Sequence, residues 1–382
     1  MKNKKEKINN KKADAGTKIS MSIMLLAGIV CGLAGGLLMA RAEEQGLQSW
    51  VAMLALLFGL YGGMLIQIIV HEMGHLAFGL ATGYKFSSFR IGSLMLKKEN
   101  GKLRLCKYSL AGTGGQCLMS PPDLVDGKMP VLLFNYGGCI NNLIISALFC
   151  INAYLHREDP VEFIVYICII VMGIAFALTN GIPMQVGPIS NDGHNALSLG
   201  KNPKAMRAFW LQLKINEQQA KGVRLKDMPA EWFAVPEDAD LNNGIVAATA
   251  VFHANWLMDQ LRVEESLEYI KELLAKETAV LGLYRSLLTC DRIYCELVVN
   301  QNVVEAVRLH DKEYEKFVKQ MKNFPSIIRT EYAYALLAEK DEKKAASFKE
   351  QFDKMAKNYP YPNDIESERE LIEEIPMMVQ DL

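Results

Sequence analysis

Long stretches without charge limit the folds open to this chain most strongly. Ile19–Ala40 holds no charged residue, and a helix of that length, at about 1.5 Å per residue, crosses a hydrocarbon core of about 30 Å. Further uncharged runs cover Gln45–Val70, Pro130–Leu155 and about Phe163–Leu178. Because the first run follows a lysine-rich segment, it can also be interpreted as a cleaved signal peptide, but its length favours a retained membrane span. We therefore expect four membrane-spanning helices.

Basic residues are concentrated on one side of these spans. The segment 85–128 is rich in Lys and Arg, whereas the connections 41–44 and 156–162 carry a single Arg each. Basic connecting segments stay in the cytoplasm. We therefore expect an integral multi-pass protein, in a bacterial cell membrane, whose N- and C-termini and 85–128 segment are cytoplasmic.

The composition changes near residue 200. The chain has 382 residues, of which 50% are hydrophobic, enough for a membrane part and a soluble part. Leu241–Met258 contains Asn and His and is predicted to be a buried helix rather than a span. We predict a basic cytoplasmic N-terminus at 1–18, a four-span membrane domain at 19–204 and a cytoplasmic helical domain at 205–382.

A short β-insertion is expected between the second and third spans. Phe86–Leu110 alternates apolar and polar residues around Glu99-Asn100-Gly101-Lys102. Asn-Gly is the strongest short signal for a β-hairpin turn. The sequence therefore predicts a hairpin in this cytoplasmic segment.

The C-terminal region repeats an amphipathic pattern. Its segments cover about 262–275, 280–299, 302–321, 327–339 and 341–358. Helix pairs of this length suggest a tetratricopeptide-like stack, and the alternative is an irregular helical bundle, because no clean repeat signature recurs. The expected fold class is an all-α polytopic membrane domain with a small β-hairpin insertion, followed by a soluble α-helical domain.

Charge and cysteine content exclude some classes of protein. The 42 basic and 43 acidic residues give a net charge of -1, so the whole molecule does not attract nucleic acid, and no nucleic-acid partner is expected. The eight cysteines are scattered, several of them inside apolar runs, where they behave as small buried hydrophobes. No disulfide framework is predicted.

A metal-binding motif follows directly on the second apolar run. His71 and His75 flank Glu72 in the sequence His-Glu-Met-Gly-His. Residues four apart on a helix share a face, so both imidazoles can bind one ion, while Glu72 takes a proton from the attacking water and later passes it to the leaving amine. An ionisable side chain inside a bilayer costs about 2.5–3.5 kcal/mol on insertion scales, so it needs a functional reason. We predict one Zn²⁺ ion per chain at this motif.

A catalytic zinc needs a third protein ligand and an open fourth position. Asp192 follows the fourth span, which runs in the same direction as the second span, so Asp192 and His75 can meet at one depth. His194 is the competing ligand. We favour Asp192, whose carboxylate can be turned toward the ion by the backbone freedom of Gly193.

Together these motifs resemble the site-2 proteases, which are intramembrane zinc metalloproteases with an HExxH span and a later Asn-x-x-Pro segment that ends in Asp-Gly. The matching residues are His71, Glu72, His75, Asn180, Pro183, Asp192 and Gly193. The resemblance implies that His71, His75 and Asp192 bind zinc and that Glu72 is the catalytic base. It also implies that Asn180 assists the binding of a substrate or transition-state oxygen.

The resemblance extends to the third span and covers about residues 45–200. Family members often carry Gly-Pro-x-x-Asn there, and Gly138 and Asn142 match, so Asn142 is a predicted substrate-binding residue. Two features depart from the pattern. Cys139 replaces the proline, and Asn191 stands where Leu is typical, in a connection between Pro183 and Asp192 that is longer than usual.

The function expected from the sequence is zinc-dependent cleavage of a peptide bond inside or beside the membrane. The substrate is expected to be a membrane protein or a peptide precursor, cleaved in regulated proteolysis or peptide-signal maturation, and 205–382 to bind a cytoplasmic partner. The alternative is a non-catalytic metal-binding membrane protein with a helical docking domain, but a structural site has no use for Glu72. The hairpin either holds an extended substrate at a sheet edge or only closes the loop.

Overall fold

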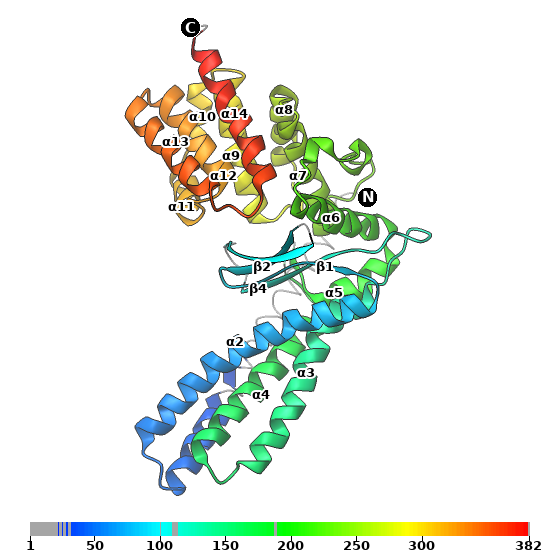
Figure 1. Cartoon of the computed structure of the whole chain (residues 1–382), viewed down its shortest axis with the longest axis vertical. Coiled ribbons are helices and arrows are strands. Elements are labelled where there is room, and N and C mark those ends of the chain that lie inside the picture. Colours follow the sequence, from blue (N-terminus) through cyan, green and yellow to red (C-terminus); the bar gives the residue numbers. More distant parts are fainter. Residues whose placement is uncertain are drawn as a thin grey trace. The chain divides into compact units, whose positions relative to one another are not determined.

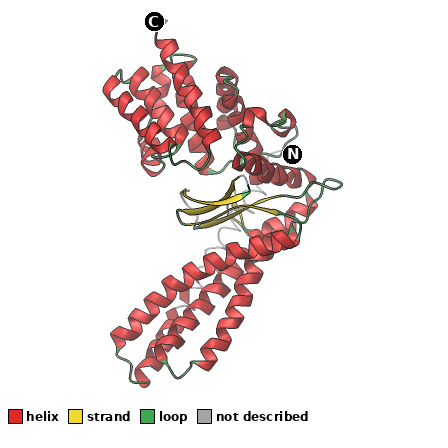
Figure 2. Cartoon of the chain, viewed as in Figure 1, coloured by secondary structure: helices red, strands yellow, loops and turns green. Residues whose placement is uncertain are grey.

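The computed structural model describes residues 32–99, 101–108, 114–186 and 189–380, with four further positions between 22 and 29. The predicted N-terminus at 1–18 lies outside these residues, and so does part of the first predicted span at 19–40. The chain forms two compact units: unit 1 is Met1–Ile91 with Gly114–Met206, and unit 2 is Gly92–Thr113 with Arg207–Leu382. Helices predominate in the described residues (Figure 2).

Three long apolar helices form the body of unit 1. They are α2 Ser49–Ala81, α3 Leu132–Leu155 and α4 Pro160–Gly181, and they lie side by side (Figure 1). Each is long and apolar enough to cross a membrane, as predicted for the second, third and fourth spans. Their apolar side chains largely face outward, as expected of helices that contact lipid rather than water.

Glycines allow these helices to approach closely. A Cβ atom on Gly74 of α2 would lie 2.6 Å from the carbonyl carbon of Gly137 on α3. Three turns earlier on α2, a Cβ on Gly63 would lie 3.2 Å from the Cα of Ile169 on α4. Since lipid tails are as apolar as the helices, close packing through small residues is a main force that holds such helices together.

The β-insertion is larger than predicted. The predicted hairpin forms between β2 Leu94–Glu99 and β3 Lys102–Lys107, where Glu99 pairs with Lys102 and Gly101 has a φ of +78°. However, β1 Lys85–Ile91 and β4 Gly115–Ser120 complete a four-stranded antiparallel sheet in the order β3-β2-β1-β4. The expectation of a lone hairpin was wrong because β4 pairs with β1 across a long connection, a non-local contact that local alternation does not reveal.

Short elements complete unit 1 after α4. A two-stranded ladder forms from β5 Gln185–Val186 and β6 Ile189–Ser190. It is followed by the short helix α5 Asp192–Ser198 and the 3₁₀ turn Leu199–Lys201.

Unit 2 contains the helices predicted after residue 205 and some that were not predicted. Its helices are α6 Pro203–Ala220, which begins at the end of unit 1, α7 Gly244–Asp259, α8 Val263–Ala275, α9 Gly282–Val298, α10 Val303–Leu309, α11 Lys312–Gln320, α12 Pro325–Ala333 with a π-helical turn Tyr334–Ala338, α13 Glu342–Ala356 and α14 Pro362–Gln380, and its 3₁₀ turns are Leu225–Asp227 and Ala230–Trp232. The segment predicted as one helix at 302–321 is divided, because Asp311 accepts hydrogen bonds from the main-chain N–H groups of Glu313 and Tyr314 and so starts a new helix. The tetratricopeptide-like arrangement stays a prediction.

Buried ion pairs join α14 to the rest of unit 2. The guanidinium of Arg224 lies 2.6 Å from Asp259 at the end of α7 and 2.8 Å from Glu370 on α14. Arg329 of α12, only 1% exposed, lies 2.6 Å from Asp291 and 3.3 Å from Glu368 of α14. Since a buried charge without a partner is costly, these pairs specify where α14 docks.

We predict that the Gly74→Ala variant destabilises unit 1 by about 1–3 kcal/mol, because the added methyl group forces α2 away from α3. Thermal unfolding in detergent should show the loss. Gly62→Ala is the matched control, since Gly62 lies in the same helix and a Cβ atom added to it would meet nothing within 4 Å. Equal stability of the two variants would contradict this account of the α2–α3 contact.

Candidate metal centre

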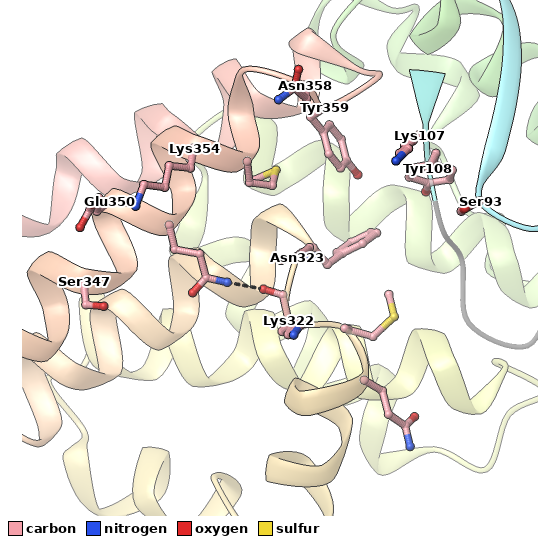
Figure 3. Close-up of a pocket in the computed structure, with 15 residues that line it drawn as sticks. Ser93, Lys107, Tyr108, Lys322, Asn323, Ser347, Glu350, Lys354, Asn358 and Tyr359 are labelled. Atoms are coloured by element: carbon pink, nitrogen blue, oxygen red, sulfur yellow. Dashed lines mark hydrogen bonds and ion pairs between the residues drawn. The ribbon is translucent and has the colours of Figure 1, made fainter. Parts of the chain in front are cut away.

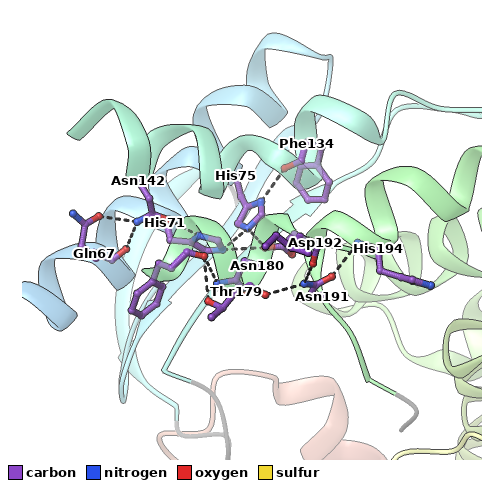
Figure 4. A network of polar contacts seen from close by, with 12 residues as sticks. Gln67, His71, His75, Phe134, Asn142, Thr179, Asn180, Asn191, Asp192 and His194 are labelled. Atoms are coloured by element: carbon purple, nitrogen blue, oxygen red, sulfur yellow. Dashed lines mark hydrogen bonds and ion pairs between the residues drawn. The ribbon is translucent and has the colours of Figure 1, made fainter. Parts of the chain in front are cut away.

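Two histidines and one aspartate converge at the end of α2. His71 and His75 lie one turn apart on α2, and Asp192 is the first residue of α5 (Figure 4). The Nε2 atom of His71 lies 3.1 Å from that of His75 and 3.0 Å from Oδ2 of Asp192, and His75 Nε2 lies 3.4 Å from the same oxygen. One ligand atom from each residue lies within 4.8 Å of the others, so the three can hold a metal ion.

The outer nitrogens of both imidazoles, the Nδ1 atoms, already have hydrogen-bond partners. His71 Nδ1 lies 2.8 Å from Oδ1 of Asn142, and His75 Nδ1 lies 2.8 Å from the main-chain oxygen of Phe134. Both partners are acceptors, so each neutral ring carries its proton on Nδ1 and its lone pair on Nε2. The Nε2 lone pairs of both imidazoles and the carboxylate of Asp192 therefore face one point. A divalent cation at that point could accept an electron pair from each of them. Imidazole and carboxylate donors suit Zn²⁺.

The electrostatics of Asp192 fit a metal ligand. Burial raises the pKa of its carboxyl, but the neighbouring imidazoles of His71 and His75 outweigh burial, and the pKa is lowered overall. The group is therefore ionised at neutral pH and can donate an electron pair.

The connection from α4 to α5 is held by Asn191. Its side-chain amide donates to the main-chain oxygens of Thr179 (2.8 Å) and Ile182 (2.6 Å). Its carbonyl oxygen accepts from the N–H groups of Met184 and His194, both at 3.0 Å. These four hydrogen bonds hold the connection that places Asp192 beside the histidines.

Gly193 lets α5 approach the end of α4. A Cβ atom there would lie 2.7 Å from the carbonyl carbon of Gly181. The expected role of Gly193 is to turn the carboxylate of Asp192 through its backbone freedom, whereas the close contact shows that a side chain at this position would not fit.

Glu72 lies between the metal ligands and the sheet. Its carboxylate accepts a hydrogen bond from the main-chain N–H of Cys117 on β4 and interacts electrostatically with His71, His75 and Asp192. A Cβ atom on Gly115, the first residue of β4, would lie 2.8 Å from Cγ of Glu72. The glycine cluster Gly112-Thr113-Gly114-Gly115 predicts a flexible turn, whereas Gly115 begins β4 and leaves the space that the side chain of Glu72 occupies.

Asn142 orients the ring of His71. Its side chain is fully buried, its Oδ1 contacts His71, and its Nδ2 donates to the main-chain and side-chain oxygens of Gln67 at 2.9 and 2.7 Å. The contact of Asn142 with substrate stays a prediction.

The other predicted residues lie near the centre. Asn180, in the last turn of α4, donates from Nδ2 to the main-chain oxygen of Phe176 at 3.0 Å (Figure 4), and its role toward substrate stays a prediction. His194 contacts Ser198 through Nδ1 at 3.4 Å and is not part of the three-residue metal group found among the described residues. Cys139 is buried within a continuous α3.

Comparison with known proteins adds no assignment: no family model matches the chain, and neither a curated protein nor a solved structure does.

A cavity of about 780 Å³ lies within unit 2 (Figure 3). The β2–β3 hairpin is joined to the helices there, because Lys97 donates to the main-chain oxygen of Pro360 at 2.5 Å and the ring of Tyr108 packs against those of Tyr359 and Tyr361. The cavity has aromatic and methionine side chains, several amides and more lysines than acids. Its lining is Ser93, Lys107, Tyr108, Gln320, Met321, Lys322, Asn323, Phe324, Ser347, Glu350, Gln351, Lys354, Met355, Asn358 and Tyr359.

We predict that Asp192→Ala loses bound zinc, whereas His194→Ala keeps about one ion per chain, since three protein ligands are needed. Elemental analysis of the purified chain after removal of loosely bound metal measures this. Retention by the first variant together with loss by the second would reverse the assignment of the third ligand.

Proposed function

We propose that this chain is a zinc-dependent endopeptidase that cleaves a membrane-embedded or membrane-proximal peptide. The observation that carries the proposal is the convergence of His71, His75 and Asp192 at one point, with Glu72 next to them. The histidines and Glu72 lie on α2, a helix of membrane-spanning length. This combination supports hydrolysis of a substrate that the membrane holds.

In this proposal, the metal ligands, Glu72 and Asn180 have separate roles in cleavage. A zinc ion held by the two histidines and Asp192 would supply Lewis acidity, activating water and polarising the peptide carbonyl. Glu72 accepts the proton of the attacking water and delivers it to the nitrogen of the leaving amine. Asn180 is the proposed donor to the oxygen of the cleaved bond.

The sheet offers a way to hold the substrate extended. A peptide bond inside a helix is shielded by the helix's own hydrogen bonds, so a substrate must unwind before cleavage. Among the described strands, β4 pairs only with β1 and forms one edge of the sheet. Because Cys117 of β4 contacts Glu72, a substrate strand added along β4 would bring a peptide bond to the catalytic base. This supports substrate presentation over simple loop closure.

The alternative function is a membrane protein in which the metal is structural and no bond is cleaved. A structural zinc site is closed by four protein ligands, whereas the group found in the described residues has three. The position of Glu72 beside that group also favours catalysis.

We further propose that unit 2 binds an extended acidic segment of a substrate or cytoplasmic partner. The cavity of unit 2 carries Lys107, Lys322 and Lys354 against a single acid, Glu350, which itself lies 2.7 Å from Lys354. Its amide side chains can form hydrogen bonds with the main chain of an extended peptide, and its aromatic rings can pack against apolar side chains of that peptide.

We predict that Glu72→Gln lowers cleavage by about 10²–10⁴-fold, the usual contribution of a general base, with zinc content unchanged. Comparative peptide profiling of membranes that contain either form measures the loss. Glu162→Gln, in the half-buried first turn of α4 and outside the metal group, is the control and should cleave normally. Cleavage at the full rate by the Glu72→Gln chain would defeat the assigned role.

For unit 2, we predict that the double variant Lys107→Glu, Lys322→Glu binds a labelled oligoglutamate peptide roughly tenfold more weakly at low salt. An exposed ion pair contributes about 0.2–1 kcal/mol, and reversal also adds repulsion. Fluorescence anisotropy with the full chain measures binding. Lys349→Glu, on α13 outside the cavity, is the control, and equal weakening by the control would count against the cavity.

A further inference from the structure

A buried line of hydrogen bonds joins His71 to helix α4. Gln67, one turn before His71 on α2, donates from Nε2 to the main-chain oxygen of Ile169 at 3.0 Å. Its Oε1 accepts from Asn142 Nδ2 at 2.7 Å, and Asn142 Oδ1 contacts His71 Nδ1 at 2.8 Å. Gln67 and Asn142 are both fully buried.

The direction of this line is fixed from the α4 end. The main-chain oxygen of Ile169 can only accept, so Gln67 must turn its NH₂ group toward Ile169 and its oxygen toward Asn142. Asn142 must then present its own NH₂ group, which also reaches the main-chain oxygen of Gln67 at 2.9 Å. Its oxygen is left for His71, which has to donate through Nδ1.

We propose that Gln67 is a positioning residue that holds His71 in the metal-binding tautomer through Asn142. If Asn142 turned its amide around, its NH₂ group would face Nδ1, and the ring would carry its proton on Nε2, where the metal binds. That rotation would break the two hydrogen bonds that the NH₂ group of Asn142 donates to the main-chain and side-chain oxygens of Gln67. This inference rests on the proposed metal site and concerns a residue outside the HExxH motif.

The packing of the three helices leaves room for this line. A Cβ atom on Gly173 of α4 would lie 2.8 Å from Cδ of Gln67. A Cβ on Gly138 of α3 would lie 2.5 Å from Cε1 of His71. Both glycines therefore provide the space that the buried amide and the imidazole occupy. A fully buried Gln in a membrane-length helix is itself unusual, because an unpaired polar group there is costly.

The test is zinc affinity, measured on the purified full chain by competition with a chromophoric chelator. We expect Gln67→Met, which keeps the length but cannot hydrogen bond like an amide, to weaken zinc binding by about 10–100-fold, the usual effect of losing an outer partner of a metal-bound histidine. Asn142→Leu should weaken binding at least as much. Adding Gln67→Met to Asn142→Leu should cause no further loss, because Gln67 acts through Asn142.

The matched control is Asn141→Leu. Asn141 also bridges α3 and α2, since its Nδ2 donates to the main-chain oxygen of Val70 at 2.7 Å, and this hydrogen bond does not involve the His71 ring. Its variant should bind zinc like the wild type. If it loses affinity as much as Gln67→Met does, the cause is helix packing, and the proposed positioning role is overturned.

The outcomes separate this inference from the proposed function. Normal zinc binding by the wild type together with unchanged affinity in Gln67→Met overturns the role of Gln67 alone. Additive losses in the double variant also overturn it, because they mean that Gln67 acts independently of Asn142. A wild type that binds no zinc overturns the metal centre and the inference together.

Discussion

The close approach of α2 and α3 is the contact on which the rest of the centre depends. Gly74 and Gly137 bring the two backbones together. That approach lets Phe134 and Asn142, both on α3, accept hydrogen bonds from the outer nitrogens of the two histidines. If larger residues separated the helices, both imidazoles would lose their partners at once, although the HExxH motif itself would be intact.

The centre also shows how polar groups are accommodated inside an apolar helix bundle. Each buried amide beside the histidines has a partner, and the line from Ile169 through Gln67 and Asn142 leaves neither amide unsatisfied. Since an unpaired polar group in hydrocarbon costs several kcal/mol, such a network is stable only when every member has its partner. The same requirement orients the ring that would bind the metal.

Unit 2 is stabilised in a different way. Its helices bury a conventional apolar core, and its buried charges occur in pairs such as Arg329 with Asp291. Its last helix, α14, was not predicted, because its apolar positions are interrupted by many acidic residues. Four apolar residues of α14 nevertheless enter that core: Ile365, Leu371, Ile372 and Ile375. The contacts of its acidic residues with Arg224 and Arg329 then help to fix where the helix docks.

The sequence by itself determined the local features. Three apolar helices, the hairpin at Asn100-Gly101 and the helical spacing of His71 and His75 follow from periodicity and turn chemistry, which act between near neighbours. Asp192 was also named correctly as the residue that joins the histidines.

Tertiary structure decided which distant groups meet. The pairing of β4 with β1, the contact of Cys117 with Glu72 and the use of Asn142 as a partner of His71 join residues far apart in the chain. Such contacts depend on how closely helices pack and on which acceptors are left over, and neither property is encoded in the spacing of a motif.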